Sequence, residues 1–148
     1  MYEFIVHDDA AADLEEIIQQ DEAAGLKLLQ LIEQLEADQD LLDRLSQREY
    51  GGTPARPVPR TAFFNTGMWV AQQAVGLNLW RMRFFGRDVN GYRLVYAFFP
   101  ADRYILLGIA EKKPIDATDD DERFDYELSH PISRRISNAY WRLVDGEW

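Results

Sequence analysis

The sequence contains no cysteine, so disulfide bonds and thiolate metal sites are excluded. No stretch approaches the roughly 18 consecutive apolar residues that a membrane-spanning helix needs. The chain also lacks a P-loop and a dinucleotide fingerprint, and no basic region precedes an apolar run at its start. We therefore expect a cytoplasmic protein with no signal peptide, no membrane association, no metal and no cofactor.

The sequence does contain enough apolar material for one folded unit. Of the 148 residues, 47% are hydrophobic and 13% are aromatic. A chain of this length fits a single domain of ordinary size. We therefore treat residues 1–148 as one domain, and we interpret its four tryptophans as core or partner-contact residues.

Charge is distributed unevenly along the chain. The formal net charge of −10 argues by itself against a polyanionic partner. Residues 51–113, however, carry nine basic and three acidic side chains, and the acidic excess lies before and after them. Positive charge is thus concentrated in the predicted sheet. The alternative is that acids prefer surface helices and the sheet holds the remainder without a functional reason.

A β-hairpin predicted over residues 77–99 is the centre of the chain. Apolar and polar side chains alternate with a period of two on both sides of Asn90-Gly91, where a tight turn needs positive φ. The alternation places Arg81 and Arg83 on one face, and Arg93 joins them if the register allows. The hairpin therefore predicts a sheet with one apolar face and one face that carries guanidinium groups.

The other segments predict an α+β fold. Residues 2–7 and 103–110 read as strands, and apolar stripes at helical spacing predict helices over residues 8–47 and after Pro131. Asp8 or Asp9 is the expected cap of the first helix. The order is an N-terminal strand, a helical hairpin, a three-stranded antiparallel meander and a C-terminal helix. We expect a single sheet with the helices on one face.

Two segments predict irregular structure. Residues 50–68 contain a Gly-Gly pair and three prolines, which interrupt regular structure. Residues 69–75 after them fit either a helical turn or an approach strand. Residues 115–127, called the acidic segment below, predict an exposed loop.

The sequence motifs of the predicted strands resemble those of the RelE/ParE superfamily of small bacterial toxins from type II toxin–antitoxin modules. The most telling string is GYRLVY at residues 91–96. Residues 79–83 are similar to the family strand in which two basic residues flank an apolar one, and residues 109–113 to the strand end that closes on a basic pair. Residues 124–136 resemble the tail of longer, HigB-like members. The element order extends the resemblance to most of the chain, but the motifs cover only residues 77–113.

In the RelE branch, the resemblance implies a ribosome-dependent endoribonuclease that cuts mRNA without a metal. The 2′-OH attacks the adjacent phosphate, which requires a base, cations for the phosphorane charge and an acid for the 5′-oxygen. The implied partners are a cognate antitoxin, the ribosome and mRNA. Two alternatives stay open: a ParE-like toxin that binds a protein target such as gyrase, and an orphan member of the fold that has lost toxicity.

The resemblance assigns the catalytic positions to Arg81, Arg83, Arg93 and Lys113. The first two match paired basic positions that are often lysines in the nuclease branch. Because an arginine does not give up its proton, we expect charge stabilisation from them and leave the general base open. Arg93 matches the phosphate-binding arginine of the family, and Lys113 stands where an arginine is usual. For each residue the alternative is a structural ion pair or a solvent-exposed charge.

Lys112 and Tyr126 complete the predicted site as RNA-binding residues. Tyr126 is the nearest substitute for the base-stacking tyrosine that the nuclease branch places soon after the basic pair. Packing in the core or in a lid is its alternative. His130 predicts a helix cap, with a catalytic acid as the alternative. The acidic run at residues 119–122 lacks the spacing of a calcium loop, so no metal site is expected.

Overall fold

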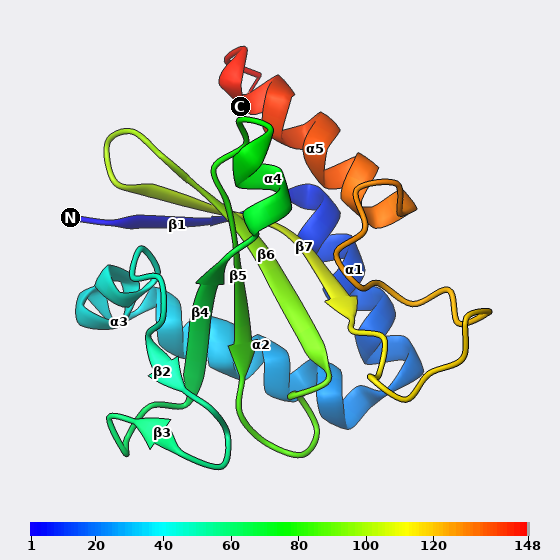
Figure 1. Ribbon diagram of the computed structural model, residues 1–148. Coiled ribbons are helices and arrows are strands. Elements are labelled where there is room, and N and C mark those ends of the chain that lie inside the picture. The colour runs from blue at the N-terminus through cyan, green and yellow to red at the C-terminus, as the bar shows by residue number, and fades with distance from the viewer. Residues whose placement is uncertain (148) are drawn as a thin grey trace.

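A computed structural model describes residues 1–147, and Trp148 lies outside the described residues (Figure 1). Its main sheet has five strands in the order β1-β7-β6-β5-β4. β1 is parallel to β7 and the other neighbours are antiparallel. These strands are β1 (Glu3–Val6), β4 (Phe64–Met68), β5 (Leu79–Phe84), β6 (Tyr92–Phe99) and β7 (Arg103–Glu111). A small second sheet pairs β2 (Gly51–Gly52) with β3 (Pro57–Val58).

Helices complete the fold before, within and after the sheet. They are α1 (Asp8–Gln20), α2 (Glu22–Glu36), α3 (Gln39–Arg44), α4 (Val70–Ala74) and α5 (Pro131–Val144). The predicted α+β class is confirmed, with its N-terminal strand, helical hairpin, antiparallel meander and C-terminal helix. Within the described residues, no helix combines the length and the apolar character needed to cross a membrane.

Histidines cap two of the helices. The Nδ1 atom of His7 accepts a hydrogen bond of 3.1 Å from the backbone N–H of Asp9, one residue before the expected aspartate cap. His130 caps α5 in the same way, accepting from the N–H of Ile132 at 3.1 Å. The prediction of His130 as a helix cap is confirmed. Pro131 follows it, where a missing N–H costs nothing.

The sheet separates two hydrophobic cores, because neighbouring side chains of a strand point to opposite faces. Leu94 and Tyr96 of β6 belong to the core under α1 and α2, whereas Val95 and Ala97 belong to the core under α5. The helices therefore cover both faces of the sheet, not one (Figure 1). The second face of the sheet also carries apolar side chains, among them Val95 and Ala97. The apolar side of α5 packs on these side chains and excludes water from them.

The connection between β5 and β6 is wider than the expected two-residue turn. It spans residues 85–91 and closes with a hydrogen bond of 2.9 Å from the N–H of Asn90 to the carbonyl of Gly86. Positive φ occurs at Gly86, at +130°, and not at Asn90 or Gly91. The predicted turn type is therefore wrong, although the hairpin itself is present.

The segment expected to be irregular provides the edge strand β4. Its residues Phe64 to Met68 pair with β5, and the N–H of Thr66 donates to the carbonyl of Tyr50 at 3.0 Å on the other side. The short helix α4 follows, as one of the two sequence alternatives predicted. This edge strand borders β5, the strand that carries Arg81 and Arg83.

Candidate functional site

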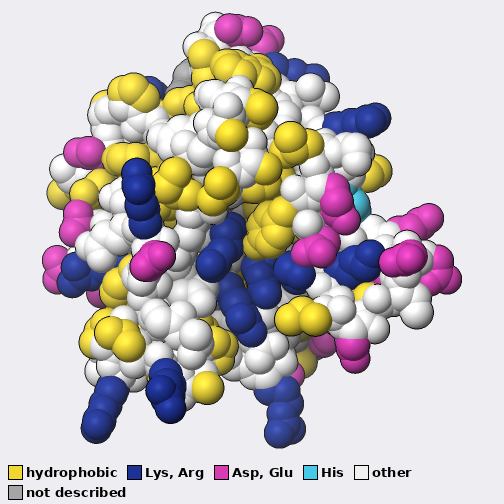
Figure 2. Space-filling model, viewed as in Figure 1, with side chains coloured by type: hydrophobic (Ala, Val, Ile, Leu, Met, Phe, Trp, Pro, Cys, Tyr) yellow, Lys and Arg dark blue, Asp and Glu magenta, His cyan; other side chains and the backbone are white. Residues whose placement is uncertain are grey.

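The register of β5 and β6 gathers the predicted arginines on one face. Arg81 lies opposite Val95, so Arg83 and Arg93, each two residues along its strand, point to the same side. All three line a pocket of about 220 Å³, called the arginine pocket below. Its lining residues are Asn65, Arg81, Arg83, Arg93, Lys112 and Tyr126. Figure 2 shows basic side chains gathered in the hollow middle of this face, with acidic side chains to the left and to the right of them.

The three guanidinium groups are held by neutral oxygens. Arg81 Nη1 donates to Asn65 Oδ1 at 2.7 Å. Arg83 Nε and Arg93 Nη1 both donate to the carbonyl of Asn90, at 3.0 and 2.9 Å. No ion pair among residues 1–147 includes any of these arginines. In the described structure these arginines therefore form no ion pairs with acidic residues of the helices, which was the alternative interpretation. Each guanidinium also keeps N–H donors that a ligand can use.

Crowding of positive charge makes the arginine pocket receptive to an anion. Burial lowers the pKa of the Arg93 guanidinium, and the charges of Arg83 and Arg81 lower it further, while Tyr126 acts in the opposite direction. Like charges in a partly desolvated site repel one another more strongly than in water. A bound oxyanion would offset this repulsion and accept hydrogen bonds from several guanidinium groups.

Lys112 lines the pocket, but its charge is already paired. Its Nζ lies 2.6 Å from Asp125 Oδ1 and donates to the carbonyl of Lys113 at 2.9 Å. The side chain of Lys113 is not part of the pocket lining. The charge of Lys113 acts instead on Asp121, whose pKa is lowered to about 2, chiefly by hydrogen bonds from Arg123.

A β-bulge explains why Lys112, and not Lys113, faces the arginines. In β7, Gly108 lies opposite Val95 but Leu106 lies opposite Tyr96, so Leu107 is an extra residue. An extra residue reverses which side chains point to each face beyond it. The structure thus brings five of the six predicted residues into one pocket and leaves Lys113 outside.

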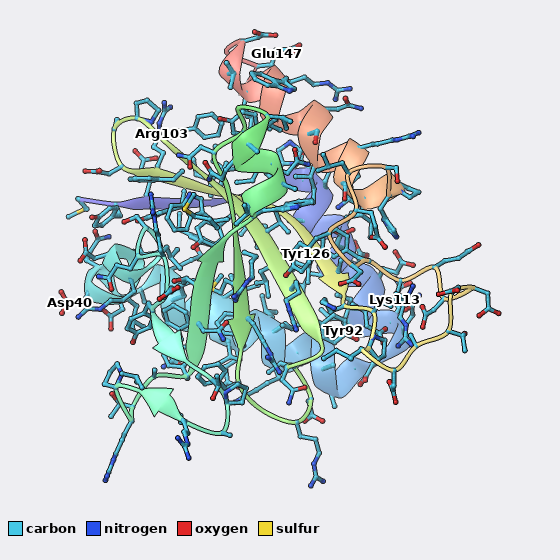
Figure 3. All side chains as sticks on the ribbon, in the orientation of Figure 1. Asp40, Tyr92, Arg103, Lys113, Tyr126 and Glu147 are labelled. Atoms are coloured by element: carbon cyan, nitrogen blue, oxygen red, sulfur yellow. The ribbon has the colours of Figure 1, made fainter. Side chains whose placement is uncertain are left out.

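Tyr126 forms one wall of the arginine pocket (Figure 3). Its ring packs edge-on against Trp69 and Phe124, with ring centroids 5.5 and 4.8 Å away, and its backbone has a φ of +65°. Its hydroxyl faces Arg93 but makes no hydrogen bond of ordinary geometry with the described residues. Burial raises the pKa of this phenol, against the opposing effect of Arg93 and Arg81. The phenol therefore stays protonated at neutral pH.

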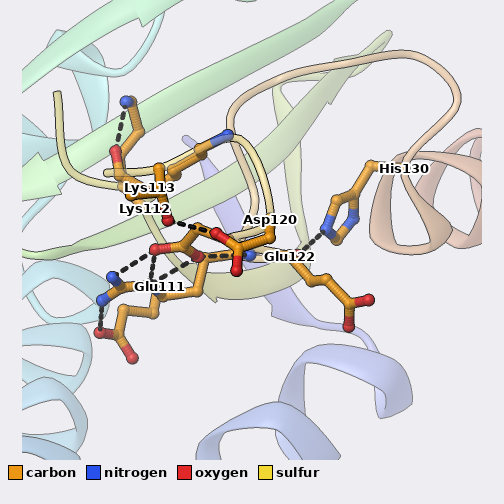
Figure 4. A network of polar contacts seen from close by, with 9 residues as sticks. Glu111, Lys112, Lys113, Asp120, Glu122 and His130 are labelled. Atoms are coloured by element: carbon orange, nitrogen blue, oxygen red, sulfur yellow. Dashed lines mark hydrogen bonds and ion pairs between the residues drawn. The ribbon is translucent and has the colours of Figure 1, made fainter. Parts of the chain in front are cut away.

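The acidic segment is ordered by ion pairs beside the pocket (Figure 4). Arg123 bridges Glu111 at 2.9 Å and Asp121 at 2.6 Å. The ring of His130 donates from Nε2 to the carbonyl of Glu122 at 2.8 Å, because its Nδ1 is already the acceptor at the cap of α5. Among residues 1–147, no group of three or more histidine, aspartate or glutamate side chains is arranged to hold a metal ion.

Sequence reasoning missed two residues of the site, both in β4. The amide of Asn65 accepts from Arg81 and donates from Nδ2 to the carbonyl of Gly52 at 3.0 Å. Gly67 leaves room for Arg81, since a Cβ there would lie 2.9 Å from Arg81 Nη2. Neither residue is visible in a sequence pattern, because their roles depend on pairing between strands distant along the chain.

Comparison of the chain with protein-family models, with curated proteins and with solved structures finds no match in any of the three. The resemblance to RelE/ParE toxins therefore stays a prediction from the sequence motifs and the order of elements.

Proposed function

We propose that this protein is the toxin of a RelE/ParE-type toxin–antitoxin module and that it cleaves mRNA at the arginine pocket without a metal ion. One observation carries the proposal: three guanidinium groups share a pocket without carboxylate partners among the described residues, in a chain of net charge −10. The planar fork of a guanidinium matches the oxygens of a phosphodiester. Three guanidinium groups in one pocket repel one another, so we expect such a cluster in an acidic protein only where it binds an anionic ligand.

In this proposal the 2′-oxygen of one nucleotide attacks the adjacent phosphorus and the bond from phosphorus to the 5′-oxygen breaks. The products are a 2′,3′-cyclic phosphate and a 5′-hydroxyl. Arg81, Arg83 and Arg93 donate hydrogen bonds to the phosphorane, whose charge grows in the transition state. Each such donor typically contributes about 100-fold to 1,000-fold in rate.

Proton transfer falls to groups other than the arginines, which stay charged. The phenol of Tyr126 is the only uncharged O–H among the side chains that line the pocket. We assign it the proton that the leaving 5′-oxygen takes up, while the proton of the 2′-OH passes to water. Its raised pKa keeps this proton in place at neutral pH.

The partners of the proposed toxin follow from the same surface. An antitoxin segment, helix or strand, would cover the arginine face and block it. The substrate would be mRNA on the ribosome, which implies a cytoplasmic location.

A second candidate is a ParE-like toxin that binds a protein target and has no nuclease activity. The observation in its favour is the neutralised Lys112, together with the acidic segment beside the pocket. Acidic groups at the rim weaken attraction to a polyanion. A non-toxic orphan of the fold is the third candidate.

Induced expression in a bacterial host separates these candidates. Growth arrest with codon-linked cuts, mapped by primer extension on a translated message, supports the nuclease. Growth arrest without cuts favours the protein-binding toxin, and unimpaired growth favours the orphan. Arg93→Glu should abolish the cuts, whereas Arg87→Glu, at an exposed position outside the pocket, should preserve them.

A further inference from the structure

A larger pocket adjoins the arginine pocket across the edge strand β4. It has a volume of about 630 Å³ and lies between residues 48–53 and β4. Asn65 and Arg81 line both pockets. The two pockets are therefore neighbours that share a guanidinium group.

Arg81 lies at the junction of three pockets. Its guanidinium crosses over Gly67 of β4, where any side chain would collide with it. A third pocket, of about 280 Å³, includes Arg81 together with Trp69, Val70 and Tyr126. A phosphate held by Arg81 would thus have the 630 Å³ pocket on one side and the 280 Å³ pocket beside Tyr126 on the other. Because residue 67 is a glycine, no side chain there blocks either pocket.

The lining of the 630 Å³ pocket is mixed in chemistry. Tyr50 and Met68 supply apolar surface, while Thr53 and Glu49 supply a hydroxyl and a carboxylate, and Arg48 adds a positive charge. A nucleoside has the same mixture, with an apolar base face, polar base edges and a ribose. The volume lies within the range of about 300 to 1,000 Å³ typical of small-molecule sites.

A peptide strand is a poorer fit to this place. Strand addition needs free backbone groups along the edge of β4. The N–H of Thr66 already donates to the carbonyl of Tyr50 at 3.0 Å, and the Asn65 side chain holds the carbonyl of Gly52 at 3.0 Å. Residues 50–52 therefore occupy that edge of the sheet.

We propose that the 630 Å³ pocket is a nucleoside subsite, which takes the base and ribose of a nucleotide next to the phosphate bound by Arg81. This inference rests on the proposed function and specifies its substrate. The two nucleosides joined by that phosphate enter different pockets, one beside residues 48–53 and the other beside Tyr126. Such a separation requires single-stranded RNA, since a duplex holds its bases in one stack.

Calorimetric titration with two probes tests the subsite. The probes are inorganic phosphate and a dinucleoside monophosphate whose 5′ nucleoside is 2′-deoxy, so that it cannot be cleaved. Thr53→Trp fills the pocket from an exposed position. We expect it to weaken dinucleotide binding about tenfold or more, as for loss of one base contact. We expect phosphate binding to change by less than about twofold, because the arginine pocket is untouched.

Two further variants make the outcome specific. Thr61→Trp places the same ring at an exposed position outside the pocket and should bind both probes as the unaltered protein does. Arg81→Ala should weaken binding of both probes.

The results also separate this inference from the proposed function. Unchanged dinucleotide binding in Thr53→Trp, or a dinucleotide that binds no better than phosphate, overturns the subsite and leaves the function standing. Failure of the unaltered protein to bind either probe overturns both. Equal binding of duplex and single-stranded RNA of the same sequence likewise contradicts the subsite.

Discussion

Asn65 orients the guanidinium of Arg81 from the neighbouring strand. Arg81 Nη1 donates to Asn65 Oδ1 at 2.7 Å, and Asn65 Nδ2 donates to the carbonyl of Gly52 at 3.0 Å. Because both ends of the amide are bonded, neither can turn without losing a hydrogen bond. Strand β2 at Gly52, the edge strand β4 and the arginine pocket are linked through this one side chain.

Replacing Asn65 by aspartate should weaken anion binding. The new carboxylate would pair with Arg81 and compete with a phosphate for it, and the bond to the Gly52 carbonyl would be lost. We expect phosphate affinity to fall about tenfold and the free energy of unfolding to fall by about 1 to 2 kcal/mol. Titration with inorganic phosphate and urea unfolding measure the two effects. Asn65→Ala is the matched control, because it should lose similar stability without adding a competing charge; undiminished phosphate affinity in Asn65→Asp would refute the pairing.

Gly67→Ala should act through Arg81 alone. The added Cβ would lie 2.9 Å from Arg81 Nη2 and would displace the guanidinium, while the backbone of Gly67 is not in the left-handed region. We expect a loss of phosphate affinity of about fivefold to tenfold, equivalent to one charged hydrogen bond. The same substitution in an Arg81→Ala background should change nothing further. Additive effects of the two substitutions would show that Gly67 has another role.

The sequence predicted the parts of this site that depend on alternation within one strand. Arg81 and Arg83 share a face because they are two positions apart in the strand, and Arg93 joins them once the hairpin is given. It did not predict β4, because Phe64–Met68 follows several prolines and lacks alternation; its strand character comes from pairing with β5.

The absence of Lys113 from the pocket has a different cause. Counting alternate residues along an unbroken β7 would place Lys113 on the pocket side. The extra residue Leu107 reverses that count. Bulges are set by packing against neighbouring strands, and Gly108 at this bulge lies under Ile136 of α5. No local pattern in the sequence predicts the position of this β-bulge.

An ion pair between α1 and α5 should contribute strongly to stability. Arg135 donates to both carboxylate oxygens of Asp13, at 2.9 and 2.6 Å, and Asp13 Oδ2 also accepts from the N–H of Ile109 at 2.9 Å. Asp13→Ala would leave Arg135 without this partner and the N–H of Ile109 without its acceptor. We expect a loss of about 2 to 3 kcal/mol in urea unfolding. Glu15→Ala, at an exposed acid of the same helix, should change stability by less than about 0.5 kcal/mol, and an equal loss in both variants would contradict this role.

Alkaline pH should destabilise the fold through its tyrosines. Burial raises the pKa of Tyr92, Tyr96, Tyr104 and Tyr126, and a hydrogen bond to Asp43 raises the pKa of Tyr2 to about 12. Above the ordinary phenol pKa of 10.0, the unfolded chain releases protons that the folded chain retains, so stability falls as the pH rises. Below about pH 10 the protonated phenols make their full contribution to the free energy of unfolding.

Urea unfolding at several pH values from neutral to alkaline measures this effect. The free energy of unfolding should show no tyrosine-dependent decline until about pH 10 and should then decrease steadily. Tyr96→Phe, which removes one fully buried phenol, should make the decline less steep. A stability that is independent of pH in this range would contradict the assignment of raised pKa values.

Binding of an RNA phosphodiester by the arginine pocket should be visible in the salt dependence of RNA affinity. The measurement compares a short single-stranded RNA bound by the unaltered protein, by Arg93→Ala and by Arg87→Ala. Arg93→Ala should bind more weakly and reduce the slope of log affinity against log salt by about 0.7, as for one lost phosphate contact. Arg87→Ala should preserve the slope. An Arg93→Ala variant with the affinity and slope of the unaltered protein would contradict the account.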